Sequence, residues 1–272
     1  MKNQKHGISD QRCDFAGSYE RSRLPAVREL ERNVLGCDYG GTSWTTRAQA
    51  EHIAESLTLR PGVQLLEIGA GSGWPGLFLA SLTGCEVTLL DIPLNTLKQA
   101  VERAVEDQIS RQVRVVAGSG TALPFASASF ERLSHSDVLC CLPDKLDLLR
   151  ECHRVATSDA RMHFSVVQPA PKLSSSDYQE ALDVGPPFIE APGGYEPLLD
   201  ESGWRILDRI DVTPEYQQSL QKLVDGMKSN IPALQEALGA DELASQRQHR
   251  EEQIALIERG ILQREVFVTS AN

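Results

Sequence analysis

Short apolar runs alternate with helical segments along most of the chain, and this alternation constrains the fold more than any other feature. The first run, Val63 to Ile68, leads directly into a cluster of glycines. Further runs follow at 86–91 and 112–118, and the stretch between them, "LNTLKQAVERAVED", has the pattern of a helix. Strands that alternate with helices are typical of βαβ units and a parallel sheet. The sequence therefore predicts an α/β fold.

The alternation continues toward the carboxyl end. The runs "RLSHSDV" and "RMHFSVV" are predicted strands on either side of the helical "DKLDLLRECHRV". Short helices are expected near 178–183 and 196–201, followed by the strands "WRILDRIDV" and "ILQREVFVT". Between these two strands, a polar helical stretch from about Glu215 to Glu258 is broken near Gly239. Upstream of the sheet, Thr46 and Gln49 have capping-box spacing, which predicts the start of a helix.

The length of 272 residues suits one elaborated domain, which we place at 36–272. The polar, aperiodic residues 1–35 are predicted to form a flexible or loosely docked arm. Two late segments, 168–200 and 214–260, are predicted inserts on the substrate side of the sheet. The second is too long for a plain connection. It is interpreted as a lid or as an oligomerisation element, such as the contact of a homodimer; the alternative is a solvated helical hairpin that merely packs on the sheet.

Composition excludes several classes of protein. Lys and Arg number 27 against 38 Asp and Glu, so the formal charge is −11, and no basic run favours nucleic acid as a partner. No signal-peptide core and no apolar stretch of membrane-spanning length is present, so a cytoplasmic protein without a membrane partner is expected. The six cysteines form no C-x-x-C, and the six histidines show no ligand spacing. We expect reduced thiols and no metal site.

The glycines after the first run have two overlapping spacings. Gly69, Gly71 and Gly73 form G-x-G-x-G, whereas a dinucleotide-type G-x-G-x-x-G would end at Gly76. Because Gly69 is the first glycine after the strand, the first spacing has the correct register. Glu67 would repel a pyrophosphate but attract a cation, and Asp91 stands where a carboxylate accepts hydrogen bonds from ribose hydroxyls. A cationic nucleoside fits best, while an NAD-dependent oxidoreductase and a purely structural glycine turn stay as alternatives.

At this point the sequence resembles the class I S-adenosylmethionine-dependent methyltransferases, particularly the small-molecule enzymes of quinone and amine methylation. The motifs that carry the likeness are "LLEIGAGSG", "VTLLDIP" and "VVAGSGTALPFASASFERLSHSDVLCCLPD", followed by "LLRECHRV". The likeness covers roughly Tyr39 to Val167. It implies a Rossmann-like, seven-stranded, mostly parallel sheet whose last strand, Ile261 to Val268, is antiparallel. It also implies a methyl transfer from S-adenosylmethionine to a small organic acceptor.

The resemblance further implies which residues bind the cofactor. Ser119 stands where the family usually has an Asp that accepts from the adenine amino group, so one adenine contact is weakened. This departure keeps a non-catalytic nucleoside-binding protein open as an alternative. The residues expected at the cofactor are Tyr39, Glu67, Gly69, Ala70, Gly71, Gly73, Asp91, Ile92, Ser119, Gly120, Thr121 and Ser134.

His135 follows the fourth strand and is the candidate catalytic base for a hydroxyl or protonated amine acceptor. Its alternative role is to pack over the adenosine or to hydrogen-bond a loop. Asp137 could bind a cationic acceptor, although such a residue more often caps a turn. The ring of Tyr39 could face the sulfonium or simply pack. The acceptor atom is left open among oxygen, nitrogen, sulfur and carbon. Apolar groups expected to enclose the acceptor are Phe188, Tyr195, Leu198, Tyr216, Leu220 and Met227.

Overall fold

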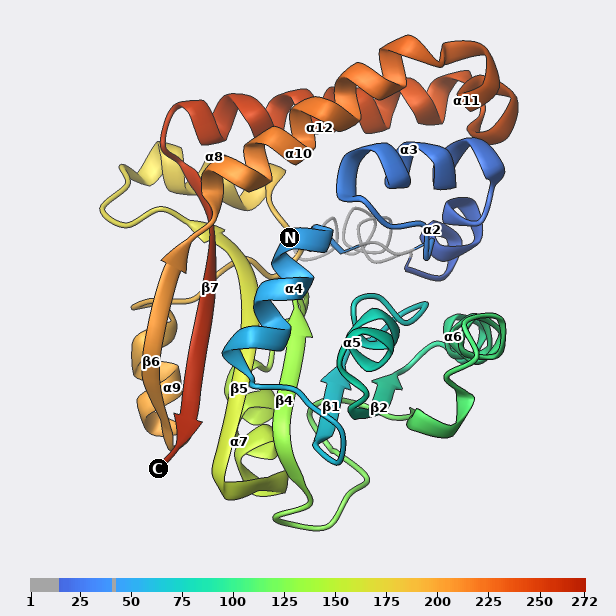
Figure 1. The fold of residues 1–272 in the computed structure, drawn as a ribbon. Coiled ribbons are helices and arrows are strands. Elements are labelled where there is room, and N and C mark those ends of the chain that lie inside the picture. Colours follow the sequence, from blue (N-terminus) through green and yellow to red (C-terminus); the bar gives the residue numbers. More distant parts are fainter. Residues whose placement is uncertain (1–14, 41–42) are drawn as a thin grey trace, which may run out of the picture.

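The computed structural model describes residues 15–40 and 43–272, which form a seven-stranded sheet flanked by helices (Figure 1). The strand order is β3-β2-β1-β4-β5-β7-β6. Strands β1 to β5 run parallel, while β7 is antiparallel to both β5 and β6. The predicted fold class is confirmed, including the neighbouring parallel pair β1 and β2. The strands are β1 Gln64–Ile68, β2 Glu86–Asp91, β3 Val113–Ala117, β4 Phe130–Ser136, β5 Ala156–Pro169, β6 Trp204–Asp211 and β7 Leu262–Ala271.

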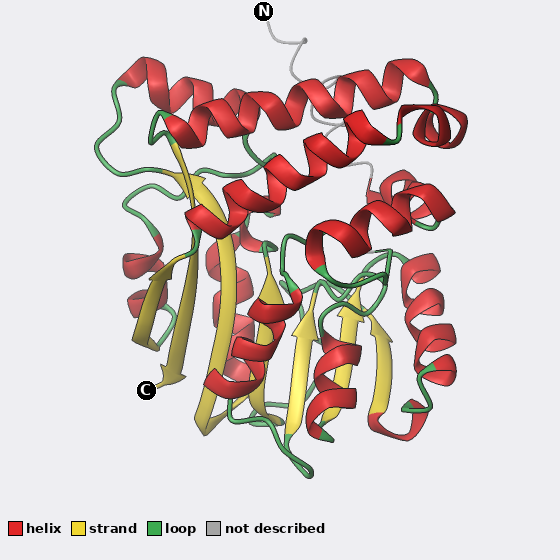
Figure 2. Cartoon of the chain, turned by 45° about the horizontal axis from the view of Figure 1, so that its top comes forward, coloured by secondary structure: helices red, strands yellow, loops and turns green. Residues whose placement is uncertain are grey.

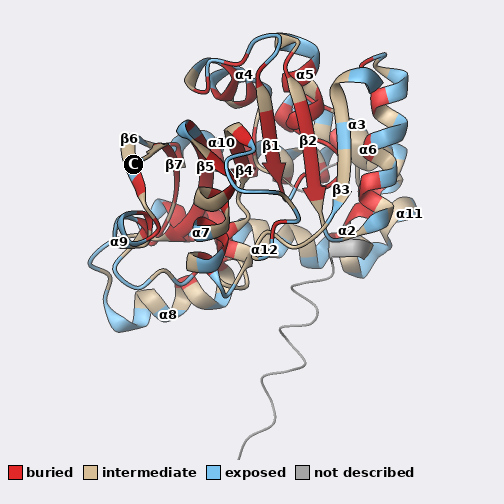
Figure 3. Cartoon of the chain, turned by 90° about the horizontal axis from the view of Figure 1, so that it is seen from below, coloured by how far each residue is buried: buried red, intermediate tan, exposed pale blue. Residues whose placement is uncertain are grey.

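Helices cover both faces of the sheet. Buried residues of α4, α5 and α6 pack together on one face, and those of α7 and α9 pack on the other (Figure 1). Successive side chains of a strand point to opposite faces, so Leu65 belongs to the first layer and Leu66 to the second. Seen from below, β1 and β2 are almost entirely buried (Figure 3). These helices are α4 Arg47–Ser56, α5 Gly76–Thr83, α6 Leu94–Glu106, α7 Lys145–Val155 and α9 Tyr195–Glu201; short 3-10 turns lie at η1 Ser110–Gln112 and η2 Leu139–Cys141.

The amino-terminal segment differs from the predicted flexible arm. Residues 15–35 form α2 (Phe15–Ser22) and α3 (Pro25–Leu35); residues 1–14 lie outside the described part of the chain. Leu30 and Val34, one helical turn apart on α3, are buried in a cluster with Met227 and Leu234. The partner surface comes from a segment about 200 residues further along the chain. For this reason the short apolar stripe of α3 did not stand out in the sequence.

The predicted insert before the last strand forms three helices, α10 (Thr213–Ser229), α11 (Ile231–Leu238) and α12 (Ala240–Glu258). They lie across the end of the sheet to which the parallel strands point, together with α8 (Ser175–Val184) (Figures 1 and 2). Gly226 lets α10 approach α3 closely, because a Cβ there would collide with Leu30 Cδ1. We refer to α2, α3 and α10–α12 as the cap. Within the described residues, no helix has both the length and the apolar character needed to cross a membrane.

The start of α4 can be tested directly. The Thr46 side chain accepts a hydrogen bond from the Gln49 backbone, and the Gln49 side chain accepts one from the Thr46 backbone, which confirms the predicted capping box. We expect Thr46→Ala to lower the free energy of unfolding by about 1 kcal/mol, as for other caps. Urea denaturation measures this, with Thr46→Ser as the conservative control. Equal stability of Thr46→Ala and the parent would contradict the capping role.

Candidate active site

The glycine loop follows β1 directly and has a backbone that only glycine adopts easily. Gly69, Gly71 and Gly73 have φ values of 70°, 53° and 100°. The loop is also closely covered: a Cβ on Gly69 would lie 2.5 Å from Val138 Cγ2, and one on Gly71 would collide with Tyr19 Oη. Side chains at these positions would therefore collide with the loop after β4 and with α2. The glycine spacing fixes the shape of this cradle.

Asp91 lies at the carboxyl end of β2, beside the cradle. Its Oδ2 accepts from the Gly71 backbone N–H at 2.6 Å, and its Oδ1 accepts from the Ile92 N–H at 2.7 Å. Each carboxylate oxygen keeps a further lone pair, so the group can still accept from a diol. Burial raises the pKa of Asp91 above its usual value. The next residue, Ile92, leaves 65% of its surface exposed, which offers an apolar platform at the same strand end.

Glu67 is buried rather than exposed to the loop, with 2% of its surface accessible. Burial raises its pKa to about 8, the backbone N–H of Gly76 lowers it only in part, and Asp91 raises it further. The carboxyl group is therefore mostly protonated at neutral pH in this conformation. Glu67 therefore carries no permanent negative charge that would attract a cation as predicted. A cation bound nearby would lower this pKa and favour the carboxylate.

The loop after β3 carries the predicted adenine contacts. Ser119 Oγ lies 2.8 Å from Thr121 Oγ1 and accepts from the Thr121 backbone N–H at 3.3 Å. Gly120 packs tightly, because a Cβ there would lie 2.9 Å from Leu148 Cδ1. Ser134, opposite Glu67 in the β1–β4 register, has a buried hydroxyl without a hydrogen-bond partner among the described residues. Hydroxyl groups in this arc can donate to and accept from a nucleoside.

His135 lies inside the sheet layer rather than in the mouth of the site. Its ring is stacked on Phe164 with centroids 4.8 Å apart, and 1% of its surface is exposed. Neither ring nitrogen has a partner among the described residues. Burial lowers its pKa to about 3, so the ring is neutral and a weak base at neutral pH. This placement does not support the predicted catalytic role, and the ring packs on Phe164 instead of making the loop hydrogen bond that was the alternative.

The tyrosine at the cradle is not the predicted one. The guanidinium of Arg103 covers the ring of Tyr39 at 4.4 Å, and the Tyr39 hydroxyl lies 3.4 Å from Asp107 Oδ2. That face is therefore not available to a sulfonium in this conformation. Tyr19 of α2 lies against Gly71 instead. It falls in a polar segment that contains no motif, so only the packing of α2 identifies it.

Asp137 forms a buried ion pair that sequence reasoning missed. Arg264 of β7 is 1% exposed and binds both carboxylate oxygens of Asp137, at 3.0 and 2.9 Å. It also donates to Gln49 Oε1 at 3.1 Å and to Ser165 Oγ at 2.9 Å. The pairing supports the interpretation of Asp137 as a turn residue, consistent with its φ of 56°. The available sequence signal was a lone arginine inside the alternating strand "LQREVFV".

The aromatic and apolar residues predicted around the acceptor do not form one group. Tyr195 contacts Phe164 and Phe267, and Leu198 packs on the same core, on the face that α7 and α9 cover. Met227 belongs to the contact with α3. Tyr216 and Leu220 lie in an apolar cluster with Cys140, which follows β4. Phe188 also lies beside this turn, because its backbone N–H donates to the Cys140 carbonyl at 3.0 Å, so three of the six predicted residues lie near the end of β4.

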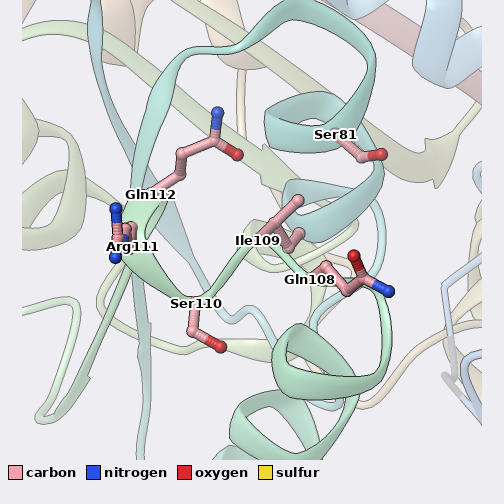
Figure 4. Close-up of a pocket in the computed structure, with 6 residues that line it drawn as sticks. All are labelled: Ser81, Gln108, Ile109, Ser110, Arg111 and Gln112. Carbon is pink, nitrogen blue, oxygen red and sulfur yellow. The ribbon is translucent and has the colours of Figure 1, made fainter.

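Two cavities lie outside this arc. One, of about 550 Å³, is lined by Ser81 and residues 108–112 at the entrance to β3 (Figure 4). Because β3 is parallel to β2, this cavity lies at the end of the sheet opposite to the glycine loop. The other, of about 240 Å³, lies between α4 and the face of β5, β7 and β6, with His52, His163 and Arg264 in its wall. The cradle and these cavities are therefore separate features.

A family model described as "Methyltransferase domain" matches residues 66–164, from β1 to β5. The chain carries a class I S-adenosylmethionine-dependent methyltransferase domain. The matched region contains the glycine loop, Asp91, the Ser119 loop and β4, whereas the cap lies outside it. The residues fit the cofactor: three glycines in the loop carry no side chain, Asp91 ends β2, and the buried hydroxyls of Ser72 and Ser134 have no partner among the described residues. The family match therefore favours the G-x-G-x-G register over the dinucleotide register.

Related sequences and solved structures support the assignment of a methyltransferase domain. The 27-O-demethylrifamycin SV methyltransferase of Amycolatopsis mediterranei is 26% identical over 66% of this chain and 68% of its own length. A putative sarcosine dimethylglycine methyltransferase from Galdieria sulphuraria has the same fold, with a TM-score of 0.74, 20% identity and coverage of 81% of this chain and 82% of its own. Phosphoethanolamine N-methyltransferase 2 of Haemonchus contortus, solved with S-adenosylhomocysteine, gives a TM-score of 0.78 at 15% identity, over 90% of this chain and 57% of its own. The donor of this methyltransferase is S-adenosylmethionine.

The raised pKa of Glu67 gives a test of the buried carboxyl group. Between the ordinary value of 4.5 and about 8, the folded methyltransferase keeps a proton that the unfolded chain has released. The free energy of unfolding therefore loses about 1.4 kcal/mol per pH unit in this window from Glu67. We expect Glu67→Gln to remove this contribution, so that the difference between the variant and the parent changes with pH. Urea unfolding at pH 5 to 8 without cofactor measures it, and parallel profiles would contradict it.

Proposed function

We propose that this methyltransferase transfers the methyl group to a small organic acceptor enclosed between the cap and the end of β4. The observation that carries the proposal is the position of α10 to α12 over the carboxyl edge of the sheet (Figure 2). Tyr216 and Leu220 of α10 pack there with Cys140, which follows β4. An apolar cover of this kind excludes water from a reacting centre. A small acceptor fits because the amino-terminal helices close the same side.

The proposed cofactor contacts divide by chemistry. Asp91 accepts from the ribose hydroxyls, Ile92 supports the adenine ring, and Ser119 to Thr121 bond its edge. Gly69, Ala70, Gly71 and Gly73 let the backbone approach the methionine part of the cofactor. Glu67 and Ser134, which are neighbours in the register, lie beneath it. Tyr19 replaces Tyr39 as the aromatic side chain at the loop.

Methyl transfer places little chemical demand on the protein. S-adenosylmethionine supplies an electrophilic methyl group: the acceptor's electron pair forms the new bond, the carbon–sulfur bond breaks with its electrons on sulfur, and the acceptor loses a proton. The chain contributes alignment and exclusion of water. With His135 neutral and stacked on Phe164, we assign it to holding the wall of the site, and the acceptor proton leaves to solvent or buffer.

We propose that nucleic acid is not a partner of this methyltransferase and that the insert is not a dimer contact. A formal charge of −11 opposes binding of a polyanion. The contact of α10 and α11 with α3 gives the insert an intramolecular partner, which supports a lid rather than a dimer contact. Retention on RNA at moderate salt would contradict this part of the proposal.

The cofactor site is tested with Asp91. We expect Asp91→Ala to weaken binding of S-adenosylhomocysteine by about 1.5–3 kcal/mol, since it removes hydrogen bonds to a charged acceptor. Titration calorimetry measures the loss, and Asp200→Ala, an exposed position on α9, is the control. NADH serves as the control ligand. Unchanged affinity in Asp91→Ala would remove the assignment.

The two roles of His135 give different outcomes. If the ring packs, His135→Gln should lower turnover less than about 10-fold and leave its pH dependence unchanged. A general base would contribute roughly 100-fold or more at neutral pH. Transfer of labelled methyl groups across pH 6 to 9 decides between them, and a loss of 100-fold with intact S-adenosylhomocysteine binding would restore the catalytic role.

A further inference from the structure

An arginine in the cap has no charged partner within the described part of the chain. Arg250 of α12 is half-buried, and its guanidinium carbon lies 5.1 Å from the centroid of the Trp44 ring. Its Nη1 donates to Gln253 Oε1 at 2.8 Å, while Nε is buried and bonds no described residue. Trp44 in turn contacts Tyr216 edge-on, with centroids 5.2 Å apart. The guanidinium thus lies over one aromatic ring and bonds an amide, and its Nε is shielded from water.

Other half-buried arginines of this chain are arranged differently. Arg103 and Arg154 each hold a carboxylate within 3.0 Å, and so does Arg264, which is fully buried. Arg132, at the far end of β4, donates to the carbonyls of Leu57 and Glu131. Arg250 forms no ion pair with any described residue. A guanidinium does not release its proton, and a charge removed from water without a counter-ion destabilises the fold.

The neighbours of Arg250 do not neutralise it. Burial raises the pKa of the Tyr216 phenol, so this group stays uncharged. Gln253 contributes only an amide oxygen. Burial lowers the pKa of Arg250 itself, in the direction expected for a cation that lacks a partner. An anion at this point would supply the missing charge.

The position of Arg250 indicates where such an anion comes from. Tyr216 connects it to Cys140, in the turn directly after β4. Val138 of the same turn lies against Gly69 of the cradle. The guanidinium therefore lies on the side of the cap that is connected to the turn after β4, where the acceptor is proposed to bind.

We propose that Arg250 binds an anionic group, a carboxylate or a phosphate, of the methyl acceptor. The inference rests on the proposed function, because it assumes that the acceptor lies beneath the cap. Trp44 and Tyr216 would contact the apolar part of the same molecule. The other source of an anion is the carboxylate of the cofactor itself, and the experiment separates the two.

The first experiment uses anions alone on protein saturated with S-adenosylhomocysteine. Benzoate and phenyl phosphate are titrated by calorimetry against benzyl alcohol, which has a similar ring and no charge. We expect at least one anion to bind 10-fold or more tightly than the alcohol, with the preference lost in Arg250→Met and partly kept in Arg250→Lys. Arg247→Met, one turn earlier on α12, is the matched control and should keep the preference. Equal binding of anions and alcohol to the parent protein would overturn the proposal.

The second measurement identifies the source of the anion. Arg250→Met should bind S-adenosylhomocysteine within about 3-fold of the parent. A loss of 10-fold or more would assign Arg250 to the cofactor carboxylate and overturn the acceptor role. If the parent itself fails to bind S-adenosylhomocysteine, the proposed function fails, whereas normal binding without an anion preference removes only the role of Arg250. Circular dichroism of each variant excludes unfolding as the cause, and the lysine variant provides the folded comparison.

Discussion

The buried ion pair between Arg264 and Asp137 is the interaction on which the arrangement of the site depends. Arg264 comes from the antiparallel last strand, and Asp137 from the turn after β4. The same guanidinium reaches Gln49 of α4 and Ser165 of β5, so four separate segments are fixed by one side chain. A pair of this kind contributes little net stability against an apolar replacement, but loss of one partner leaves a buried charge that costs roughly 3–5 kcal/mol. The main effect of the ion pair is therefore to fix the positions of these segments relative to one another.

The position of the turn after β4 in turn defines the glycine cradle. Val138 follows Asp137 and occupies the space that a side chain on Gly69 would need. On the other side, Tyr19 occupies the corresponding space at Gly71. The cradle is thus formed by a loop from within the matched domain and a helix from outside it. A glycine motif gives an open backbone, and the surrounding segments decide what can approach it.

Buried ionisable groups at this end of the sheet are handled in three ways. Glu67 and His135 lose their charge through burial, in opposite pKa directions; the Gly76 N–H only partly offsets this effect at Glu67, and His135 has no hydrogen-bond partner among the described residues. Arg264 keeps its charge beside Asp137. Arg250 keeps its charge beside aromatic rings. Only Arg250 keeps a charge without a counter-ion among the described residues. This difference is why we propose Arg250 as a recognition group and the other three as residues that maintain the fold.

The sequence by itself determined the sheet, the register of the glycines and the place of Asp91, because these follow from local patterns. Apolar periodicity sets each strand, and a backbone with positive φ requires Gly69, Gly71 and Gly73 wherever the chain turns in this way. Thr46 and Gln49 likewise satisfy each other within one helical turn. The tertiary structure alone decided which side chains meet: that Tyr19 rather than Tyr39 lies at the loop, that Arg264 binds Asp137, and that His135 stacks on Phe164. These contacts join residues far apart in the chain, and their energies depend on burial and partner geometry, which no local pattern specifies.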